Sequence, residues 1–154
     1  MIERVITSSI LNKLGKGKAI VLIGPRQVGK TTLLNSIIKD KSHLFLDGDD
    51  PTVRNILQNI NTEQLKTVIG NHNLVFIDEA QRIENIGLTI KILTDQFKNV
   101  QLLVSGSSAF EIKNLTNEPL TGRKWQYNLF PISWEEFEND KGHLKAMQQL
   151  EQRI

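Results

Sequence analysis

One segment constrains this chain more than any other, because it matches the pattern GxxxxGK[ST] of phosphate-binding loops. It consists of Gly24, Pro25, Arg26, Gln27, Val28, Gly29, Lys30 and Thr31. An unbroken apolar run over residues 19–23 stands directly before the segment, and residues 30–41 carry apolar side chains at helical spacing. Strand, glycine loop and helix therefore follow in the order that a phosphate loop requires, which predicts binding of a nucleoside triphosphate.

The residue types of this loop each have a physical reason. The two glycines let the backbone bend until successive amides point at phosphate oxygens, and the following helix offers its positive end to the same anion. Lys30 supplies an ammonium group for the outer phosphates, and Thr31 supplies a hydroxyl for Mg²⁺. Together with Thr32, the loop residues are the predicted nucleotide-binding set.

Composition and charge exclude several classes of protein. The chain has 154 residues, 39% hydrophobic and 23% charged, which describes one soluble globular domain. It lacks cysteine, an export signal and any apolar run near the roughly 18 residues of a membrane span. We expect a cytoplasmic protein with no membrane partner. The net charge of +2 does not indicate nucleic acid, because its basic and acidic blocks coincide with the predicted nucleotide site.

Strand and helix patterns alternate through the first hundred residues. Strands are expected over residues 19–23, 43–47, 74–77, 100–104 and 124–129, and helices over 2–14, 30–41, 61–69 and 86–97, with another beginning at Asp50-Pro51. Continuous apolar strands fit a parallel sheet covered on both faces, whereas the alternation in 124–129 fits an edge strand. We predict an α/β fold of the P-loop NTPase type, with a mostly parallel five-stranded sheet sandwiched between helices.

We expect one P-loop domain over residues 1–154. Its parts are an N-terminal helix over 1–17, a nucleotide-binding core over 18–132 and the start of a helical segment over 133–154. Ser133 and Glu136 have capping-box spacing, which marks the beginning of that segment. The last helical pattern is cut off by the chain end, so we expect a fragment or a domain whose partner is missing.

Asp78 and Glu79 follow the strand predicted over residues 74–77. An aspartate at that position can hold Mg²⁺ directly or through a water, and the next glutamate can polarise the water that attacks the terminal phosphate. Acidic residues also end strands as ordinary turn formers. Joined to the phosphate loop, the pair favours a catalytic site.

Several segments together resemble one family of ATPases. They are residues 24–31, 78–81, 105–108, 120–123 and 130–137, which read GPRQVGKT, DEAQ, SGSS, LTGR and FPISWEEF. In this combination the chain resembles the prokaryotic AAA-type ATPases that pair such a domain with a separate C-terminal domain. The resemblance implies Mg²⁺-dependent ATP hydrolysis by Lys30, Thr31, Asp78 and Glu79, coupled to movement of an attached domain or partner protein. It is also compatible with a homo-oligomer.

The same resemblance implies a polar sensor after the fourth strand. Ser107 is the preferred sensor and Ser105 the reserve, because a hydroxyl there can lie between the γ-phosphate and the attacking water. Ordinary hydrogen bonding in a serine-rich turn is an equal alternative.

Arg123 is a candidate arginine finger or sensor, in cis or in trans, although an arginine in such a loop is commonly solvated surface.

Other functions stay open. A nucleotide-gated switch with little turnover is one, because at most the start of the helical lid of AAA-type enzymes is present. The segment Asp78-Glu79-Ala80-Gln81 also resembles the second motif of helicases, which need two such domains. A GTPase is disfavoured because no Asn-Lys-x-Asp element follows the fourth strand, and a small-molecule kinase because neither an acceptor pocket nor an arginine-rich lid is identifiable.

Overall fold

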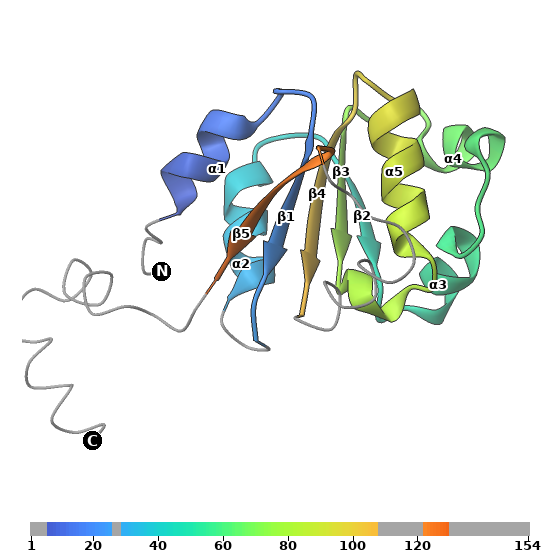
Figure 1. Ribbon diagram of the computed structural model, residues 1–154, viewed down its shortest axis with the longest axis horizontal. Helices are drawn as coiled ribbons and strands as arrows, with labels where there is room; N and C mark the ends of the chain where they lie inside the picture. The colour runs from blue at the N-terminus through green and yellow to red at the C-terminus, as the bar shows by residue number, and fades with distance from the viewer. Residues whose placement is uncertain (1–5, 26–28, 108–121, 130–154) are drawn as a thin grey trace, which may run out of the picture.

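The computed structural model describes residues 6–25, 29–107 and 122–129 (Figure 1). In chain order the elements are α1 (Thr7–Lys13), β1 (Ala19–Ile23), α2 (Lys30–Ile38), β2 (Leu44–Asp47), α3 (Pro51–Leu57), α4 (Thr62–Ile69), β3 (Leu74–Asp78), the single 3₁₀ turn η1 (Ala80–Arg82), α5 (Ile86–Gln96), β4 (Gln101–Gly106) and β5 (Lys124–Asn128). Within these ranges, no helix has the length and apolar character needed to cross a bilayer.

The strands form one five-stranded sheet in the order β2-β3-β4-β1-β5, and every neighbouring pair is parallel. The predicted α/β fold of the P-loop type is therefore confirmed, as is the edge position of the strand over residues 124–128. All carboxyl ends of the strands meet at one side of the sheet, which we call the carboxyl edge. The opposite side is the amino edge. The phosphate loop leaves β1 at the carboxyl edge, between the ends of β4 and β5.

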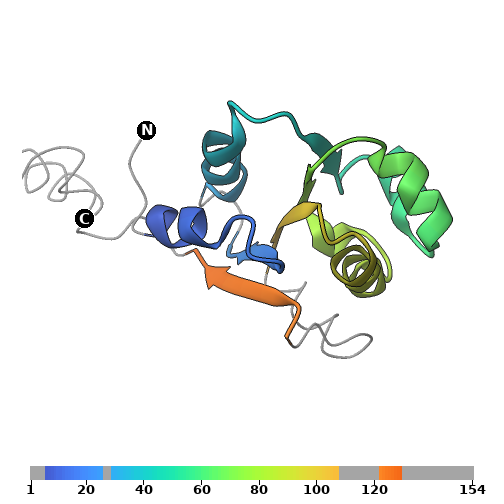
Figure 2. The same cartoon turned by 90° about the horizontal axis from the view of Figure 1, so that it is seen from above.

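Helices cover both faces of the sheet, as Figure 2 shows. Alternate residues of β1 divide between two cores: Ile20 and Leu22 pack with α1 and α2, whereas Val21 and Ile23 pack with α3, α4 and α5. Because β1 is buried on both faces, its sequence is continuously apolar. The interior strand that carries the phosphate loop is thus packed on both faces.

Local capping explains where two of the helices begin. Asp50 accepts a hydrogen bond from the amide of Thr52 at 2.9 Å, and Pro51 occupies the first turn of α3. The helix α4 begins after Asn61, which forms a reciprocal capping box with Gln64. Both starts agree with the sequence prediction.

Other boundaries differ from the prediction. The strand β4 continues to Gly106 instead of ending at 104, because its last residues pair with the end of β1. The turn η1 was not predicted. The helical segment expected over 133–154 lies outside the described residues, so the division into 1–17, 18–132 and 133–154 stays a prediction.

Candidate nucleotide site

The phosphate loop joins the end of β1 to the beginning of α2. The amide of Gly24 donates to the carbonyl of Gly106 at 3.2 Å, which ties the start of the loop to the end of β4. Gly29 has φ 94° and ψ 24°, in the left-handed region where a side chain would be strained. This turn lets α2 begin at Lys30 with its amino end directed at the loop. Arg26, Gln27 and Val28 lie outside the described residues.

Lys30 is the charged group of the loop. Its side chain is buried, with 4% of the residue exposed. The ammonium Nζ donates to the carbonyl oxygens of Gly24 at 2.9 Å and Pro25 at 2.7 Å. A buried cation is therefore held at the start of the loop, and its predicted role in binding phosphates stays a prediction. Thr32 lies in the first turn of α2 and is exposed.

Thr31 and Asp78 come together from α2 and β3. The hydroxyl Oγ1 of Thr31 lies 2.9 Å from Oδ1 and 3.1 Å from Oδ2 of Asp78. Two oxygen ligands on adjacent corners of a Mg²⁺ octahedron, with bonds of 2.0–2.1 Å, are about 2.9 Å apart. The structure thus brings together a hydroxyl and a carboxylate at hydrogen-bond distance, and both are oxygen ligands of the kind that Mg²⁺ prefers.

Glu79 is held in an unusual backbone conformation at the end of β3. Its φ of 51° and ψ of 48° are left-handed, which few residues other than glycine adopt and which is common at functional sites. Its amide donates to the hydroxyl of Ser105 at 3.1 Å, and its carboxylate Oε2 accepts from Nε2 of Gln81 at 2.7 Å. The backbone of Glu79 is thus held by Ser105, and its carboxylate is held by Gln81.

Ser105 and Ser107, the two predicted sensors, have different surroundings. Ser105 is fully buried in β4, and its hydroxyl donates to Oδ1 of Asp78 while it accepts from the amide of Glu79. The buried Ser105 hydroxyl therefore holds the side chain of Asp78 and the backbone of Glu79. Ser107 follows β4, and its amide donates to Oε1 of Gln81 at 3.1 Å. A sensor role for Ser107 stays a prediction.

A family model described as an AAA domain matches residues 16–138. The chain belongs to this AAA domain family. It is also 30% identical over 125 residues to "Uncharacterized protein Rv2008c" of Mycobacterium tuberculosis and to "Uncharacterized protein Mb2031c" of Mycobacterium bovis. These matches cover 80% of the chain but only 27% of the length of either relative.

A solved structure shares the fold of this AAA domain. The Walker-type ATPase PABY2304 of Pyrococcus abyssi superposes with a TM-score of 0.61 at 16% identity, over 90% of this chain and 56% of that one. Family and fold agree with the predicted AAA-type P-loop ATPase domain, which is confirmed. The separate C-terminal domain expected from the resemblance stays a prediction.

Gly48 is a residue of the AAA domain site that the sequence reasoning missed. Its amide donates to the carbonyl of Asp78 at 2.7 Å. A Cβ atom at this position would lie 2.2 Å from the carbonyl oxygen of Glu79 and 2.8 Å from that of Asp78. Arg54 braces the turn by donating to the carbonyls of Gly48 and Asp49 at 3.0 and 2.9 Å. Only glycine lets this turn pack against the backbone of the acid pair.

Gln81 was quoted in the sequence analysis only as part of a motif and received no role. The structure places its amide between Glu79 and Ser107. Its position two residues after the glutamate was the available signal, since a glutamine there has both a donor and an acceptor within reach of the strand ends.

Arg123 is not brought to the site of its own AAA domain. It precedes β5, so it lies at the amino edge, and its carbonyl accepts from the amide of Ala19 at 3.0 Å. Its Nε donates to Oδ1 of Asp95 on α5 at 3.0 Å. The five residues of β1 separate this point from the phosphate loop by about 16 Å. The described arrangement does not bring Arg123 to the phosphate loop, and its role as an arginine finger or sensor, in cis or in trans, stays a prediction.

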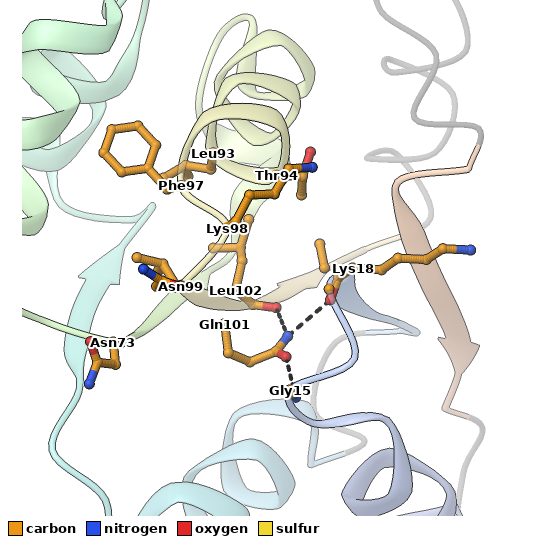
Figure 3. Close-up of a pocket in the computed structure, with 13 residues that line it drawn as sticks. Gly15, Lys18, Asn73, Leu93, Thr94, Phe97, Lys98, Asn99, Gln101 and Leu102 are labelled. Carbon is orange, nitrogen blue, oxygen red and sulfur yellow. Dashed lines mark hydrogen bonds between the residues drawn. The ribbon is translucent and has the colours of Figure 1, made fainter.

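The amino edge also carries a pocket of about 390 Å³ (Figure 3). Its wall includes Gln101, whose Oε1 accepts from the amide of Gly15 at 2.7 Å and whose Nε2 donates to the carbonyls of Lys18 and Leu102 at 3.0 Å each. These bonds join the segment after α1 to the first residue of β4. The pocket lies at the other end of the strands from Lys30, Thr31 and the acid pair, so it is not the nucleotide site.

Proposed function

We propose that this AAA domain binds ATP with Mg²⁺ at the carboxyl edge and hydrolyses it, and that hydrolysis moves an attached domain or partner protein. The observation that carries the proposal is the contact between Thr31 and Asp78, because it joins the phosphate-loop helix to the acid pair with the oxygen spacing of a magnesium site. The greater length of the mycobacterial relatives supports the attached domain.

Each side chain has one task in this proposal. Lys30 exchanges its two backbone carbonyl partners for oxygens of the outer phosphates, which a buried ammonium binds strongly. Thr31 and Asp78 supply oxygens to Mg²⁺, which when bound would neutralise charge on the phosphates. Glu79 accepts a hydrogen bond from the attacking water and acts as the general base that takes its proton.

The test separates binding from hydrolysis. Glu79→Gln keeps the size of the side chain but removes the base, so we expect ATP affinity close to that of the wild type and a hydrolysis rate about 10²- to 10⁴-fold lower. Isothermal titration measures the first quantity and single-turnover release of phosphate the second. Glu84→Gln, the same change at an exposed residue beyond η1, is the matched control.

Three results would count against the proposal. Glu79→Gln turning over ATP at the wild-type rate would remove the catalytic role of that residue. A wild-type protein that binds ATP and keeps it intact for hours would instead favour the nucleotide-gated switch. Acceleration of the wild-type rate by DNA or RNA would favour the helicase-like alternative.

A further inference from the structure

Gln81 occupies a bridging position in the carboxyl edge. It lies in η1, the single turn that follows Glu79, and its side-chain amide reaches two different segments. Nε2 donates to Oε2 of Glu79 at 2.7 Å, and Oε1 accepts from the amide of Ser107 at 3.1 Å. The side chain thus links the candidate base to the residue that follows β4.

The chemistry of the partners sets the orientation of this amide. A carboxylate can only accept, and a backbone N–H can only donate. Turning the amide of Gln81 over would place two acceptors together at Glu79 and two donors together at Ser107. Both contacts are therefore made in one orientation only, and the bond to the carboxylate is of the stronger, charge-assisted kind.

The bridge extends to the phosphate loop through β4. The residue before Ser107 is Gly106, whose carbonyl accepts from the amide of Gly24 at 3.2 Å. Ser105 on the same strand holds the amide of Glu79. One strand end therefore contacts the loop, the backbone of Glu79 and, through Gln81, its carboxylate. The position of the base is defined relative to the site of phosphate binding.

We propose that Gln81 is a positioning residue for hydrolysis, which holds the Glu79 carboxylate with Oε1 directed to accept from the attacking water. This inference rests on the proposed function. Within the described part of the chain, Oε2 of Glu79 accepts from Gln81 and no hydrogen bond reaches Oε1. Gln81 itself touches neither ATP nor water in this role and acts through Glu79.

The test uses Gln81→Met, which keeps length and volume but loses both hydrogen bonds. We expect the single-turnover rate to fall about ten- to hundred-fold, because small displacements of a catalytic group have effects of this size. ATP affinity should stay within about three-fold, since the phosphate-binding groups are untouched. Gln81→Glu keeps an acceptor for Ser107 but puts a like charge beside Glu79, so it should not rescue the rate. Gln96→Met, at an exposed position ending α5, is the control.

A double-mutant cycle distinguishes positioning from a general structural role. If Gln81 acts through the base, Gln81→Met should cost little further activity in a Glu79→Gln background. An equal fold-loss in both backgrounds, a parallel loss of ATP affinity, or a rate at or above the wild type would overturn the inference. Failure of the proposed function would look different, because the wild type itself would not hydrolyse ATP or Glu79→Gln would hydrolyse it normally.

Discussion

The amino edge and the carboxyl edge of the sheet each carry a polar cluster, and the two clusters contain different chemical groups. At the amino edge, Gln101 is bonded to three backbone groups, and Arg123 is paired with Asp95. At the carboxyl edge, Lys30 of α2 donates to backbone carbonyls at the start of the loop, and Thr31 of α2 contacts the side chain of Asp78 from β3. The first set connects elements of the fold. The second gathers an ammonium, a hydroxyl and carboxylates, which are the groups that bind phosphate and magnesium.

The parallel sheet explains this difference. Every strand ends at the carboxyl edge, so loops from distant parts of the sequence converge there and their side chains can form a site. At the amino edge the strands begin, and the polar side chains there form hydrogen bonds with the segments that connect the preceding helices to the strands. We therefore expect substitutions at the carboxyl edge to affect nucleotide chemistry and those at the amino edge to affect stability alone.

The most direct way to break this comparison is Lys30→Ala. Removing the buried ammonium should lower ATP affinity about a hundred-fold or more, equivalent to about 2.7 kcal/mol. Titration calorimetry with MgATP measures the change. Lys39→Ala, at the exposed end of the same helix, should bind as the wild type does. Equal affinities for the wild type and Lys30→Ala would remove the phosphate-binding assignment.

Gly48→Ala tests whether backbone packing belongs to the carboxyl edge. The new methyl group meets the carbonyl of Glu79 at 2.2 Å, so the turn or the acid pair must move. We expect a loss of about 1–3 kcal/mol in the free energy of unfolding, together with slower hydrolysis. Urea denaturation and single-turnover assays measure both effects. Asp49→Ala in the same turn loses only an exposed pair with Arg82 and should cost less than about 1 kcal/mol. A fully stable, fully active Gly48→Ala would contradict the packing argument.

Gln101→Ala sharpens the comparison from the amino edge. It removes the hydrogen-bond partner of the exposed Gly15 amide and of the half-buried Lys18 carbonyl, so the free energy of unfolding should fall by about 0.5–1.5 kcal/mol. ATP affinity, measured in the same preparation, should not change. Gln96→Ala serves as the control. A loss of nucleotide binding in folded Gln101→Ala would show that the two edges are coupled.

The smallest effect is expected at Asp95. The hydrogen bond from Arg123 is the main cause that lowers the pKa of this carboxyl group, helped by the charges of Arg123, Lys98 and Lys91 and opposed by burial. A carboxyl group with a lowered pKa stabilises the fold above its ordinary pKa of about 3.9, and the contribution is lost as the pH falls through the lowered value.

Asp95→Asn should therefore reduce the urea midpoint slightly at pH 7, and the difference from the wild type should shrink at strongly acid pH, as the pH falls through the lowered pKa. Urea titrations at the two pH values make the measurement. Asp40→Asn, in the exposed turn after α2, is a control that should change little at either pH. A difference that persists unchanged at acid pH would mean that the ion pair is not its cause.

Patterns local in the sequence predicted most of this molecule. The apolar run of β1 predicted a strand buried on both faces. The glycine loop followed by Lys30 and Thr31 predicted a phosphate-binding loop at the end of that strand. Asp78 was predicted at the site because parallel strands end at a common edge. All three inferences depend on neighbouring residues and on one rule of topology.

The remaining features depend on contacts between distant segments. Gly48 and Gln81 matter because of what lies across from them, on β3 and after β4, which no local pattern encodes. The distance of Arg123 from the phosphate loop has a simpler reason. A residue that comes before a parallel strand lies at the edge opposite the phosphate loop, and the direction of β5 was not included in that prediction.

The hydroxyl of Ser105 contacts both residues of the acid pair, because it donates a hydrogen bond to the Asp78 carboxylate and accepts one from the backbone amide of Glu79. A change to the side chain of Asp78 is therefore transmitted through Ser105 to the backbone of Glu79. A replacement of Ser105 alters both together. Asp78 and Glu79 are therefore coupled through one serine hydroxyl, and their positions are expected to change together.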